Sequence, residues 1–426
     1  MKIGIITTGT RGDIQPFISL SVALLQRGHH VTFIAPSNFK NFIESFNIKF
    51  VPLSVDFEEI ICDPIFVKLL YSGNGFKYLK YFRKKVTKSV REKIGVETLD
   101  ATRGVDYLIS NTINLSTVYS IGEKFDKKVA VVSINMPSTP TTEFPFLTFK
   151  NFKSPWLNKF SYNILRLFWL VIKKETNEYR SYLGLPKLNF WKTLQESNIL
   201  IIYSMSPLIS RPMDWPSNTH VTGFFNMPVS EQQNIYISDI PAGLEEWLKI
   251  GDSPIYIGFG SMPIPDPSLF SAILNEILIT TDLRFVFGLG WSSMPELLQH
   301  SNLFVVKNIN HQWLLPQCKT AIFHGGIGTV AAVMRAKIPS IVLSIFSDQP
   351  SNGVMMQNIH IAIHIPFTKI STKKLLSAIQ KTQTPLMIES AKKFGDIVIK
   401  ENGLIDAVDL IEAYFDKPLD QKNNKA

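Results

Sequence analysis

Short apolar runs alternate with longer amphipathic stretches along most of this chain. Five runs in the first half have the length and β-branched content of buried strands: Lys2–Thr8, "HHVTFIAP", "IKFVPL", "VDYLISN" and "KVAVVSINMP". The loop "TGTRGD" and an expected helix over Pro16–Arg27 separate the first two runs. Strands that alternate with helices in this way predict βαβ units and a parallel sheet.

The same alternation of predicted strands and helices returns after residue 245. Strands are predicted at "PIYIGFGS", "RFVFGLGW", "LFVVKNI", "KTAIFHGG" and "PSIVLSI". Helices are expected at "DPSLFSAILNEILITT", at "GTVAAVMRAK" and over Thr372–Tyr414. We therefore predict an α/β protein with two Rossmann-like halves facing each other, whose ligands bind in the cleft at the carboxyl ends of the strands.

The domain boundaries follow from where this rhythm breaks. The chain of 426 residues is long enough for two cores. We expect an N-terminal domain over residues 1–212, a proline-rich linker over 213–245, a C-terminal domain over 246–415 and a disordered tail over 416–426. Aromatic-rich, partly helical sequence at 143–195 interrupts the first domain.

Composition excludes several classes of protein. The two cysteines, Cys62 and Cys318, offer neither a disulfide framework nor a zinc site. The amino terminus has the pattern of a first strand rather than of a signal peptide. No uninterrupted apolar run reaches the length of a membrane span. These features predict a soluble, cytoplasmic protein.

The net charge of +9 favours anionic partners. Much of the excess lies in "GFKYLKYFRKKVTKSVREKIG", where Leu79, Phe82, Val86 and Val90 recur at helical spacing. Two interpretations of this basic helix at 76–94 stay open: a surface helix with solvated lysines, or one that docks peripherally on an anionic membrane. No motif supports a nucleic-acid partner.

A glycine loop, His324-Gly325-Gly326-Ile327-Gly328-Thr329, stands between a predicted strand and a predicted helix. Glycines let the backbone approach a ligand, and the free N–H groups at a helix start bind anions. The imidazole and the Thr329 hydroxyl add donors for a diphosphate. A tight turn without a ligand is the alternative.

Asp348 and Gln349 follow the next predicted strand. Their acceptors and amide, in series, suit adjacent hydroxyl groups of a sugar ring. The alternative is a helix cap by Asp348 ahead of Pro350. A loop that binds phosphate and a following loop that binds sugar hydroxyls together indicate a nucleotide-sugar as the ligand.

Six motifs over nearly the whole chain carry a family resemblance. They are "GTRGDIQPFISLSVALLQRGHHVTFIAP", "YRSYLGLP", "MDWPSNTHVTGFF", "LEEWLKIGDSPIYIGFGSM", "NHQWLLPQC" and "HGGIGTVAAVMRAKIPSIVLSIFSDQP". In this order they resemble the inverting UDP-glycosyltransferases of the two-domain GT-B fold. The similarity is greatest to the branch with sterol glucosyltransferases and the enzymes that glycosylate antibiotic aglycones.

The resemblance implies roles for particular residues of the donor site. His324, Gly326, Gly328 and Thr329 match the diphosphate loop, Asp348 and Gln349 match the pair that holds the sugar hydroxyls, and Ser261 matches a position near the phosphates. Trp291 and the segment Ile309–His311 would flank the base. The chain departs from the family at four places, with Asn310, Gln312, Ile327 and Phe323.

Asp13 is the candidate base for the incoming hydroxyl, because it follows the first strand and a glycine-rich turn. The resembling branch has a proposed base at this aspartate. A helix cap is the alternative role for Asp13. Arg11 would contact the acceptor or pair with a surface acid, whereas His29 and His30 read as structural.

The sequence thus predicts an inverting, metal-independent transfer of a hexose, glucose first, from a UDP-sugar to a hydroxyl of an apolar molecule such as a sterol, lipid or polyketide. The UDP-sugar would be a co-substrate, with no cofactor and no metal. The acceptor would contact aromatic-rich loops at Phe57–Gly95 and Glu143–Trp191. The alternative is an inactive, nucleotide-sugar-binding scaffold or activator. An NAD-dependent dehydrogenase is disfavoured, since no GxGxxG follows the first strand.

Overall fold

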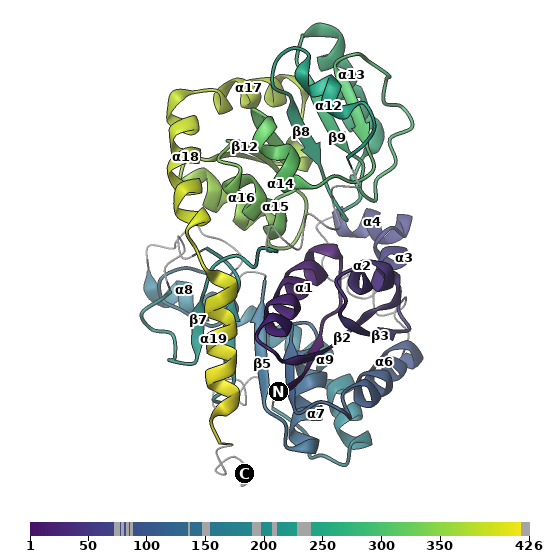
Figure 1. Ribbon diagram of the computed structural model, residues 1–426, viewed down its shortest axis with the longest axis vertical. Helices are drawn as coiled ribbons and strands as arrows, with labels where there is room; N and C mark the ends of the chain where they lie inside the picture. Colours follow the sequence, from purple (N-terminus) through teal and green to yellow (C-terminus); the bar gives the residue numbers. More distant parts are fainter. Residues whose placement is uncertain are drawn as a thin grey trace.

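Two parallel sheets form the two halves of the protein in the computed structural model (Figure 1). The structure describes residues 1–71, 77, 81, 85, 88–134, 137–146, 154–189, 197–206, 211–227 and 240–418. In spatial order, the strands of the first sheet are β3 (Lys49–Leu53), β2 (His30–Pro36), β1 (Lys2–Ile6), β4 (Tyr107–Ser110), β5 (Val129–Ser133), β6 (Leu200–Tyr203) and β7 (Thr219–Val221). Those of the second are β10 (Leu303–Val306), β9 (Phe285–Gly288), β8 (Ile255–Gly258), β11 (Thr320–Phe323), β12 (Ser340–Ser344) and β13 (Ala362–Pro366).

The helices cover both faces of each sheet, which is why the strands are apolar throughout. Strands β5, β8, β9, β11 and β12 are buried along their whole length. The helices are α1 (Arg11–Gln26), α2 (Lys40–Glu44), α3 (Phe57–Ile61), α4 (Pro64–Tyr71), α6 (Lys88–Ala101), α7 (Leu115–Phe125), α8 (Pro155–Ser161), α9 (Ile164–Tyr182), α12 (Leu244–Lys249), α13 (Pro267–Thr280), α14 (His311–Leu314), α15 (Ile327–Arg335), α16 (Gln349–Asn358), α17 (Thr372–Thr382), α18 (Pro385–Ile399) and α19 (Gly403–Asp416).

The strand order confirms the predicted pair of Rossmann-like halves. In each sheet the order runs outward in one direction and then restarts beside the first strand, between β1 and β4 and again between β8 and β11. Loops that leave neighbouring strands at such a switch point diverge and open a crevice. The loops after β1 and β11 carry Asp13 and His324, so the topology brings both candidate loops to a crevice edge.

The last helix, α19, returns to the first half of the molecule and completes its core. In Figure 1 this yellow helix runs beside the lower half, away from the neighbouring helix α18. Its residues Leu404, Val408 and Ile411 belong to the same buried cluster as β1 and α1. Phe415 stacks on Tyr107 of β4 with ring centroids 4.5 Å apart.

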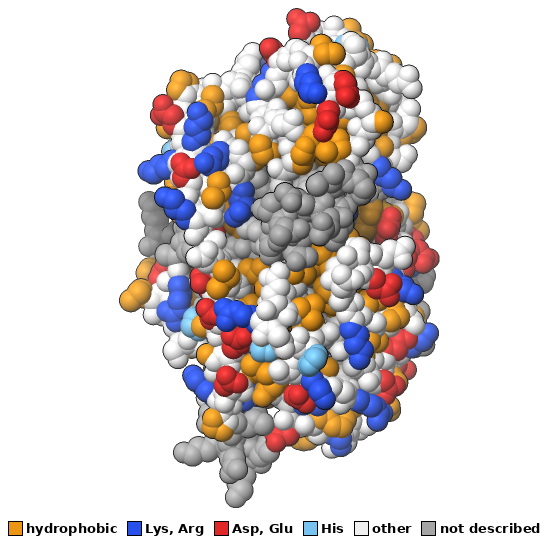
Figure 2. Space-filling model, in the orientation of Figure 1, with side chains coloured by type: hydrophobic (Ala, Val, Ile, Leu, Met, Phe, Trp, Pro, Cys, Tyr) orange, Lys and Arg blue, Asp and Glu red, His pale blue; other side chains and the backbone are white. Residues whose placement is uncertain are grey.

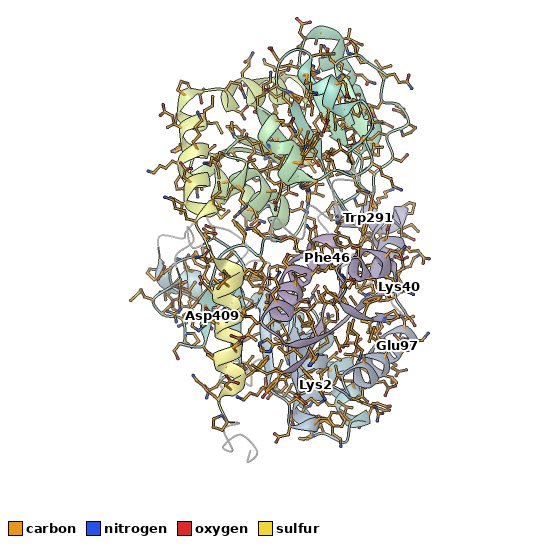
Figure 3. All side chains as sticks on the ribbon, in the orientation of Figure 1. Lys2, Lys40, Phe46, Glu97, Trp291 and Asp409 are labelled. Carbon is orange, nitrogen blue, oxygen red and sulfur yellow. The ribbon has the colours of Figure 1, made fainter. Side chains whose placement is uncertain are left out.

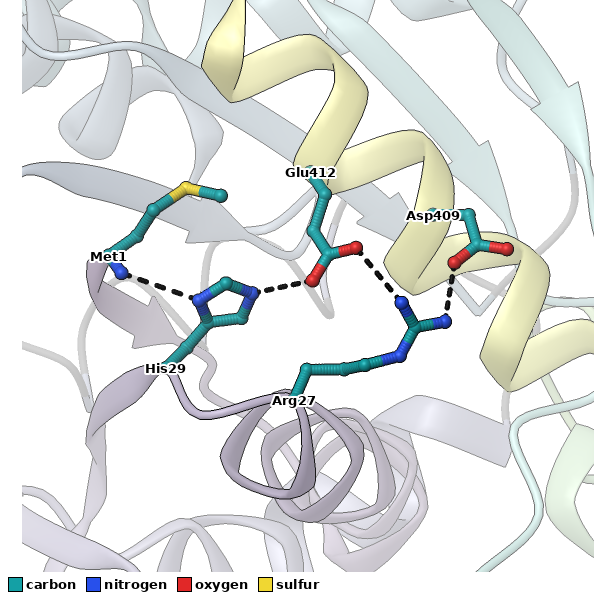
Figure 4. Close-up of polar contacts among 5 residues, drawn as sticks. All are labelled: Met1, Arg27, His29, Asp409 and Glu412. Carbon is teal, nitrogen blue, oxygen red and sulfur yellow. Dashed lines mark hydrogen bonds and ion pairs between the residues drawn. The ribbon is translucent and has the colours of Figure 1, made fainter.

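A polar network fastens α19 to the end of α1 (Figure 4). The Arg27 guanidinium lies 2.6 Å from an Asp409 carboxylate oxygen and 3.2 Å from one of Glu412. Glu412 also meets Nε2 of His29 at 2.7 Å, and Nδ1 of that ring lies 3.3 Å from the amino terminus of Met1. The expectation that His29 is structural fits this network.

Lys128 caps the carboxyl end of α19. The Lys128 side chain is buried, and Nζ donates to the carbonyl groups of Tyr414 at 2.8 Å, Phe415 at 3.2 Å, and Lys417. A cation at a helix carboxyl terminus satisfies carbonyls that have no partner within the helix.

Lys128→Met is expected to lower the free energy of unfolding by about 2 kcal/mol, because the thioether stem cannot donate to those buried carbonyls. The urea midpoint of unfolding measures this loss. The exposed neighbour Lys124 provides the control, since Lys124→Met removes the same charge without a cap. Equal midpoints for both variants would contradict the capping role.

Two placements differ from the expected domain boundaries. Strand β7 lies inside the range expected as linker, yet it pairs with β6 in the first sheet. Helix α19 lies inside the expected C-terminal domain, yet it packs on the N-terminal half. The division into domains near residues 212 and 246 otherwise stays a proposal.

Two other expectations fall partly outside the described residues, namely about half of the basic helix at 76–94 and most of the tail at 416–426. Among the helices that the structure does describe, none combines the length and apolar composition needed to cross a membrane.

Candidate active site

A cavity of about 530 Å³ opens between the two sheets, where the loops at their carboxyl ends meet. Ten of the eleven predicted site residues line it, with Trp291 as the exception: Arg11, Asp13, Ser261, His311, His324, Gly326, Gly328, Thr329, Asp348 and Gln349. The residues come from both halves of the molecule. The cavity therefore has the two-sided construction that a transfer between two substrates requires.

Asp13 stands in the first turn of α1, and Thr10 is the N-cap of that helix. The Asp13 carboxylate oxygen Oδ2 accepts hydrogen bonds from the Thr10 amide at 2.8 Å and the Thr10 hydroxyl at 3.1 Å. Gly9 has φ +136°, and a side chain there would clash with the Asp13 carboxylate. Asp13 thus takes part in capping, although Thr10 rather than Asp13 occupies the N-cap position, and it lines the cavity at the same time.

The surroundings of Asp13 tune its acidity toward that of a base. Burial raises the pKa of Asp13 to about 6, against the two hydrogen bonds from Thr10, which lower it. The negative charge of Asp348, across the cavity, raises this pKa further. A carboxylate with a pKa near 6 is mostly ionised at pH 7 and accepts a proton more readily than an ordinary aspartate.

His324 ends β11 and folds its imidazole over the glycine loop. A side chain at Gly326 would clash with Nε2 of this ring, so the glycine makes room for the imidazole. Burial, with the neighbouring His311, lowers the pKa of His324 to about 4. The ring is therefore neutral at pH 7, and its buried Nδ1 has no hydrogen-bond partner in the described part of the chain.

Helix α15 begins within the glycine loop, at Ile327, with Gly326 as its N-cap. The first amide groups of a helix have no carbonyl ahead of them and carry the positive end of the helix dipole. Gly328, in this first turn, has open space beside it, and both Gly328 and Thr329 line the cavity. The helix start and His324 together form a site that suits a diphosphate.

Asn352 joins this loop to the second predicted loop. Its Nδ2 donates to the Gly325 carbonyl at 2.9 Å and to Oδ2 of Asp348 at 3.1 Å. Asn352 is buried in α16, one turn after Asp348, and the sequence analysis missed it. The spacing "DQPSN" was the available signal, since residues four apart share one side of a helix.

Asp348 and Gln349 face the cavity with different groups. Asp348 is the N-cap residue of α16, as the alternative interpretation held, but its side chain makes no capping hydrogen bond. Burial raises the pKa of Asp348. The Gln349 oxygen Oε1 accepts from the amides of Ile345 at 2.9 Å and Phe346 at 3.1 Å. The Gln349 amide nitrogen is consequently the group of that side chain which can donate to a ligand.

His311 and Tyr256 form a pair beneath the cavity. Nε2 of His311 lies 2.8 Å from the Tyr256 hydroxyl, and burial lowers the pKa of His311 to about 4, with the charge of Arg11 adding to the effect. The Tyr256 hydroxyl fills space that side chains at Gly258 and Gly288 would take. Tyr256 lines the cavity but was missed, because its strand pattern is that of a core residue.

Trp291 is the predicted site residue that does not line the cavity. Its amide donates to the Gly260 carbonyl at 3.0 Å, and its ring packs against the core cluster of the N-terminal half. Figure 3 shows it at the border between the two halves. The tight approach of Gly290 to Gly260 directs the chain this way. The assignment of Trp291 beside a nucleotide base stays a prediction.

The N-terminal half supplies an apolar wall. Phe57, Ile61 and Phe66 lie within the first range expected to contact the acceptor, and all three line the cavity. Among the described residues of the second range, 143–191, none lines it. Further apolar lining comes from loops that were not predicted: Ile113, Ile134, Phe224, Phe225 and Met227.

Comparison with known families matches both halves of the chain. Residues 3–104 match the model of the glycosyltransferase family 28 N-terminal domain, and residues 272–399 match that of the erythromycin biosynthesis protein CIII-like C-terminal domain. Together the two matches cover more than half of the sequence. The chain carries a glycosyltransferase family 28 N-terminal domain.

Similar proteins and structures agree with this family. The chain is 30% identical to a sterol 3-beta-glucosyltransferase of Arabidopsis thaliana over 97% of its own length, and 29% identical to one of Komagataella phaffii over its whole length. It spans 65% and 35% of these two relatives.

Solved structures show the same fold at low identity. The glycosyltransferase of kitacinnamycin is 14% identical, with a TM-score of 0.69 and coverage of 97% of this chain and 99% of that one. The calicheamicin glycosyltransferase is 12% identical, with a TM-score of 0.67 and 97% coverage of both. The predicted GT-B fold is confirmed.

Proposed function

We propose that this GT-B protein transfers a hexose, glucose first, from a UDP-sugar to a hydroxyl of an apolar small molecule, with inversion and without a metal. One observation carries the proposal. Asp13, from the N-terminal half, and the loops of His324 and Asp348, from the C-terminal half, line the same cavity, and the charge of Asp348 acts on the pKa of Asp13.

In the proposed reaction, Asp13 takes the proton of the acceptor hydroxyl as that oxygen forms its bond to the anomeric carbon. The bond between this carbon and the diphosphate oxygen breaks on the opposite face, and the configuration inverts. The start of α15 and the His324 ring would hold the negative charge of the leaving diphosphate, the task that a cation performs elsewhere. Asp348 and Gln349 would hold the sugar hydroxyls.

The nature of the substrates rests on the apolar wall and on the names of the relatives. Phe57, Ile61 and Phe66 favour an apolar acceptor, and the similar proteins are sterol glucosyltransferases. Two of the similar structures are complexes with thymidine diphosphate rather than with a uridine nucleotide. Uridine as the base of the donor is therefore part of the proposal. We further propose a cytoplasmic location with peripheral membrane contact. The inactive scaffold is not favoured, since the base candidate and both donor loops are in place.

Calorimetric titration with UDP-glucose tests the proposal. We expect micromolar binding that His324→Ala weakens about tenfold, because a buried donor to the diphosphate is lost. His30→Ala, at an exposed histidine outside the cavity, should leave binding unchanged. Binding of another nucleotide-sugar only would change the donor. Absence of heat with every nucleotide-sugar would contradict the function. Donor binding without any sugar transfer would favour the scaffold.

A further inference from the structure

Helices α8 and α9 present large apolar side chains to the solvent. Leu167 and Leu170 of α9 are 62% and 63% exposed, and Trp156 of α8 is 66% exposed. Among the described side chains between residues 154 and 174, the large exposed apolar ones are Trp156, Leu157, Phe160, Ile164, Leu167, Leu170 and Ile172. We call these residues the α8–α9 surface. Monomeric proteins rarely leave so many large apolar side chains together in water without a partner.

The exposed residues gather because the helices are turned outward. On α9, Ile164, Leu167 and Leu170 recur every three residues and share one side of the helix. The inward side holds buried Trp169 and Arg180, and the Arg180 guanidinium pairs with Glu123 at 2.9 Å. On α8 the rings of Trp156 and Phe160 stack with centroids 5.0 Å apart.

The exposed charges on α8 and α9 are mostly positive. Residues 154–174 contain four basic residues and no acidic one: Lys159, Arg166, Lys173 and Lys174. All four are exposed. By contrast, the face of the molecule in Figure 2 shows acidic and basic side chains interspersed over both halves. Glu175 and Glu178 follow on α9, and Asp214 lies near Lys159, so the two helices carry an excess of exposed cations rather than cations alone. An apolar surface with such an excess of cations has the chemistry that suits an anionic lipid bilayer.

Hydrogen bonds join α8 to the segment that follows β5. Nδ2 of Asn158 in α8 donates to the Thr142 carbonyl at 2.9 Å, and the Phe146 amide donates to the Ser161 hydroxyl at 2.7 Å. The segment that these bonds hold follows β5 in the sequence. Ile134, the residue directly after β5, lines the cavity.

We propose that the α8–α9 surface docks on an anionic phospholipid bilayer, from which the acceptor is drawn. The proposal rests on the proposed function, because it locates the membrane contact of an enzyme with an apolar acceptor. It assigns this contact to α8 and α9, whereas the sequence pointed to residues 76–94. A second copy of the chain is disfavoured as the occupant, since a two-fold interface would bring four cations of each copy against one another.

Vesicle sedimentation tests the proposal with the full-length protein. We expect binding to vesicles of phosphatidylcholine with phosphatidylglycerol, and weaker binding to phosphatidylcholine alone. The double variant Leu167→Ser/Leu170→Ser should bind the anionic vesicles roughly tenfold more weakly. The control, Ile279→Ser/Leu386→Ser, changes two exposed apolar residues of the C-terminal half and should bind like the parent. Thermal unfolding checks that both variants are folded.

UDP-glucose titration of the same variants separates this proposal from the function. Unchanged vesicle binding by the double variant, or no vesicle binding by the parent, would overturn the docking surface. The docking surface would also be overturned if the parent does not bind vesicles but forms a dimer in sedimentation velocity, and if the double variant abolishes that dimer. If vesicle binding depends on Leu167 and Leu170 while no nucleotide-sugar binds, the surface stands and the proposed function falls.

Discussion

Asp13→Asn is expected to lower kcat by about 10²- to 10⁴-fold, the range that a positioned general base contributes. The asparagine keeps an oxygen able to accept the Thr10 hydrogen bonds, so the helix start should survive. It cannot take a proton from the acceptor hydroxyl. Donor binding, which depends on the opposite half of the cavity, should stay within a factor of about two.

The measurement is the rate of glucose transfer at saturating acceptor, with UDP-glucose titration alongside. For the parent enzyme, kcat/KM should rise with pH through an acid limb near pH 6, because Asp13 must be ionised to act as base and its pKa is about 6. The variant should lack this limb. Asp266→Asn is the matched control, since Asp266 caps α13 away from the cavity. Similar losses of kcat in both variants would contradict the role of Asp13 as a base and leave it only a role in capping the helix.

Asp348→Asn is expected to lower kcat/KM roughly 10- to 100-fold, because a charged acceptor to the sugar hydroxyls is lost. The same change should move the acid limb to lower pH. The negative charge of Asp348 raises the pKa of Asp13, so its removal lets Asp13 ionise at lower pH. A pH profile of kcat/KM records both effects.

Asn352→Ala separates the position of Asp348 from its charge. This variant removes the amide that holds the Asp348 carboxylate and the Gly325 carbonyl, and leaves the charge in place. We expect a loss in kcat/KM with the acid limb close to that of the parent. An Asp348→Asn profile with an unmoved limb would show that the charge of Asp348 does not affect the ionisation of Asp13.

The strands, and the placement of the two candidate loops at the cavity, were predictable because their signals are local. Buried parallel strands are apolar throughout, and a loop that follows such a strand lies at the carboxyl edge of the sheet, where ligands bind in this fold class. Asn352 and Tyr256 escaped prediction because their roles come from contacts that the tertiary structure makes. Asn352 matters through Gly325, and Tyr256 through His311, which is 55 residues away.

Two further differences have the same physical origin. The apolar face of the last helix predicts that it is buried, but an amphipathic pattern does not specify which of two cores receives it. The resemblance assigns Trp291 to the nucleotide base, but its sequence does not show that Gly290 approaches Gly260 so closely and leaves Trp291 outside the cavity lining. Such backbone contacts between distant segments have no signature in a single sequence.

The return of α19 to the first half has a consequence for synthesis on the ribosome. Strand β7 is the last strand of the first sheet, and roughly 180 residues separate it from α19, about 10 to 40 s of translation. During that interval the groove that Leu404, Val408 and Ile411 later fill stays open on the emerging chain. A nascent polypeptide arrested just before residue 403 would carry a nearly finished second domain beside an unfinished first one.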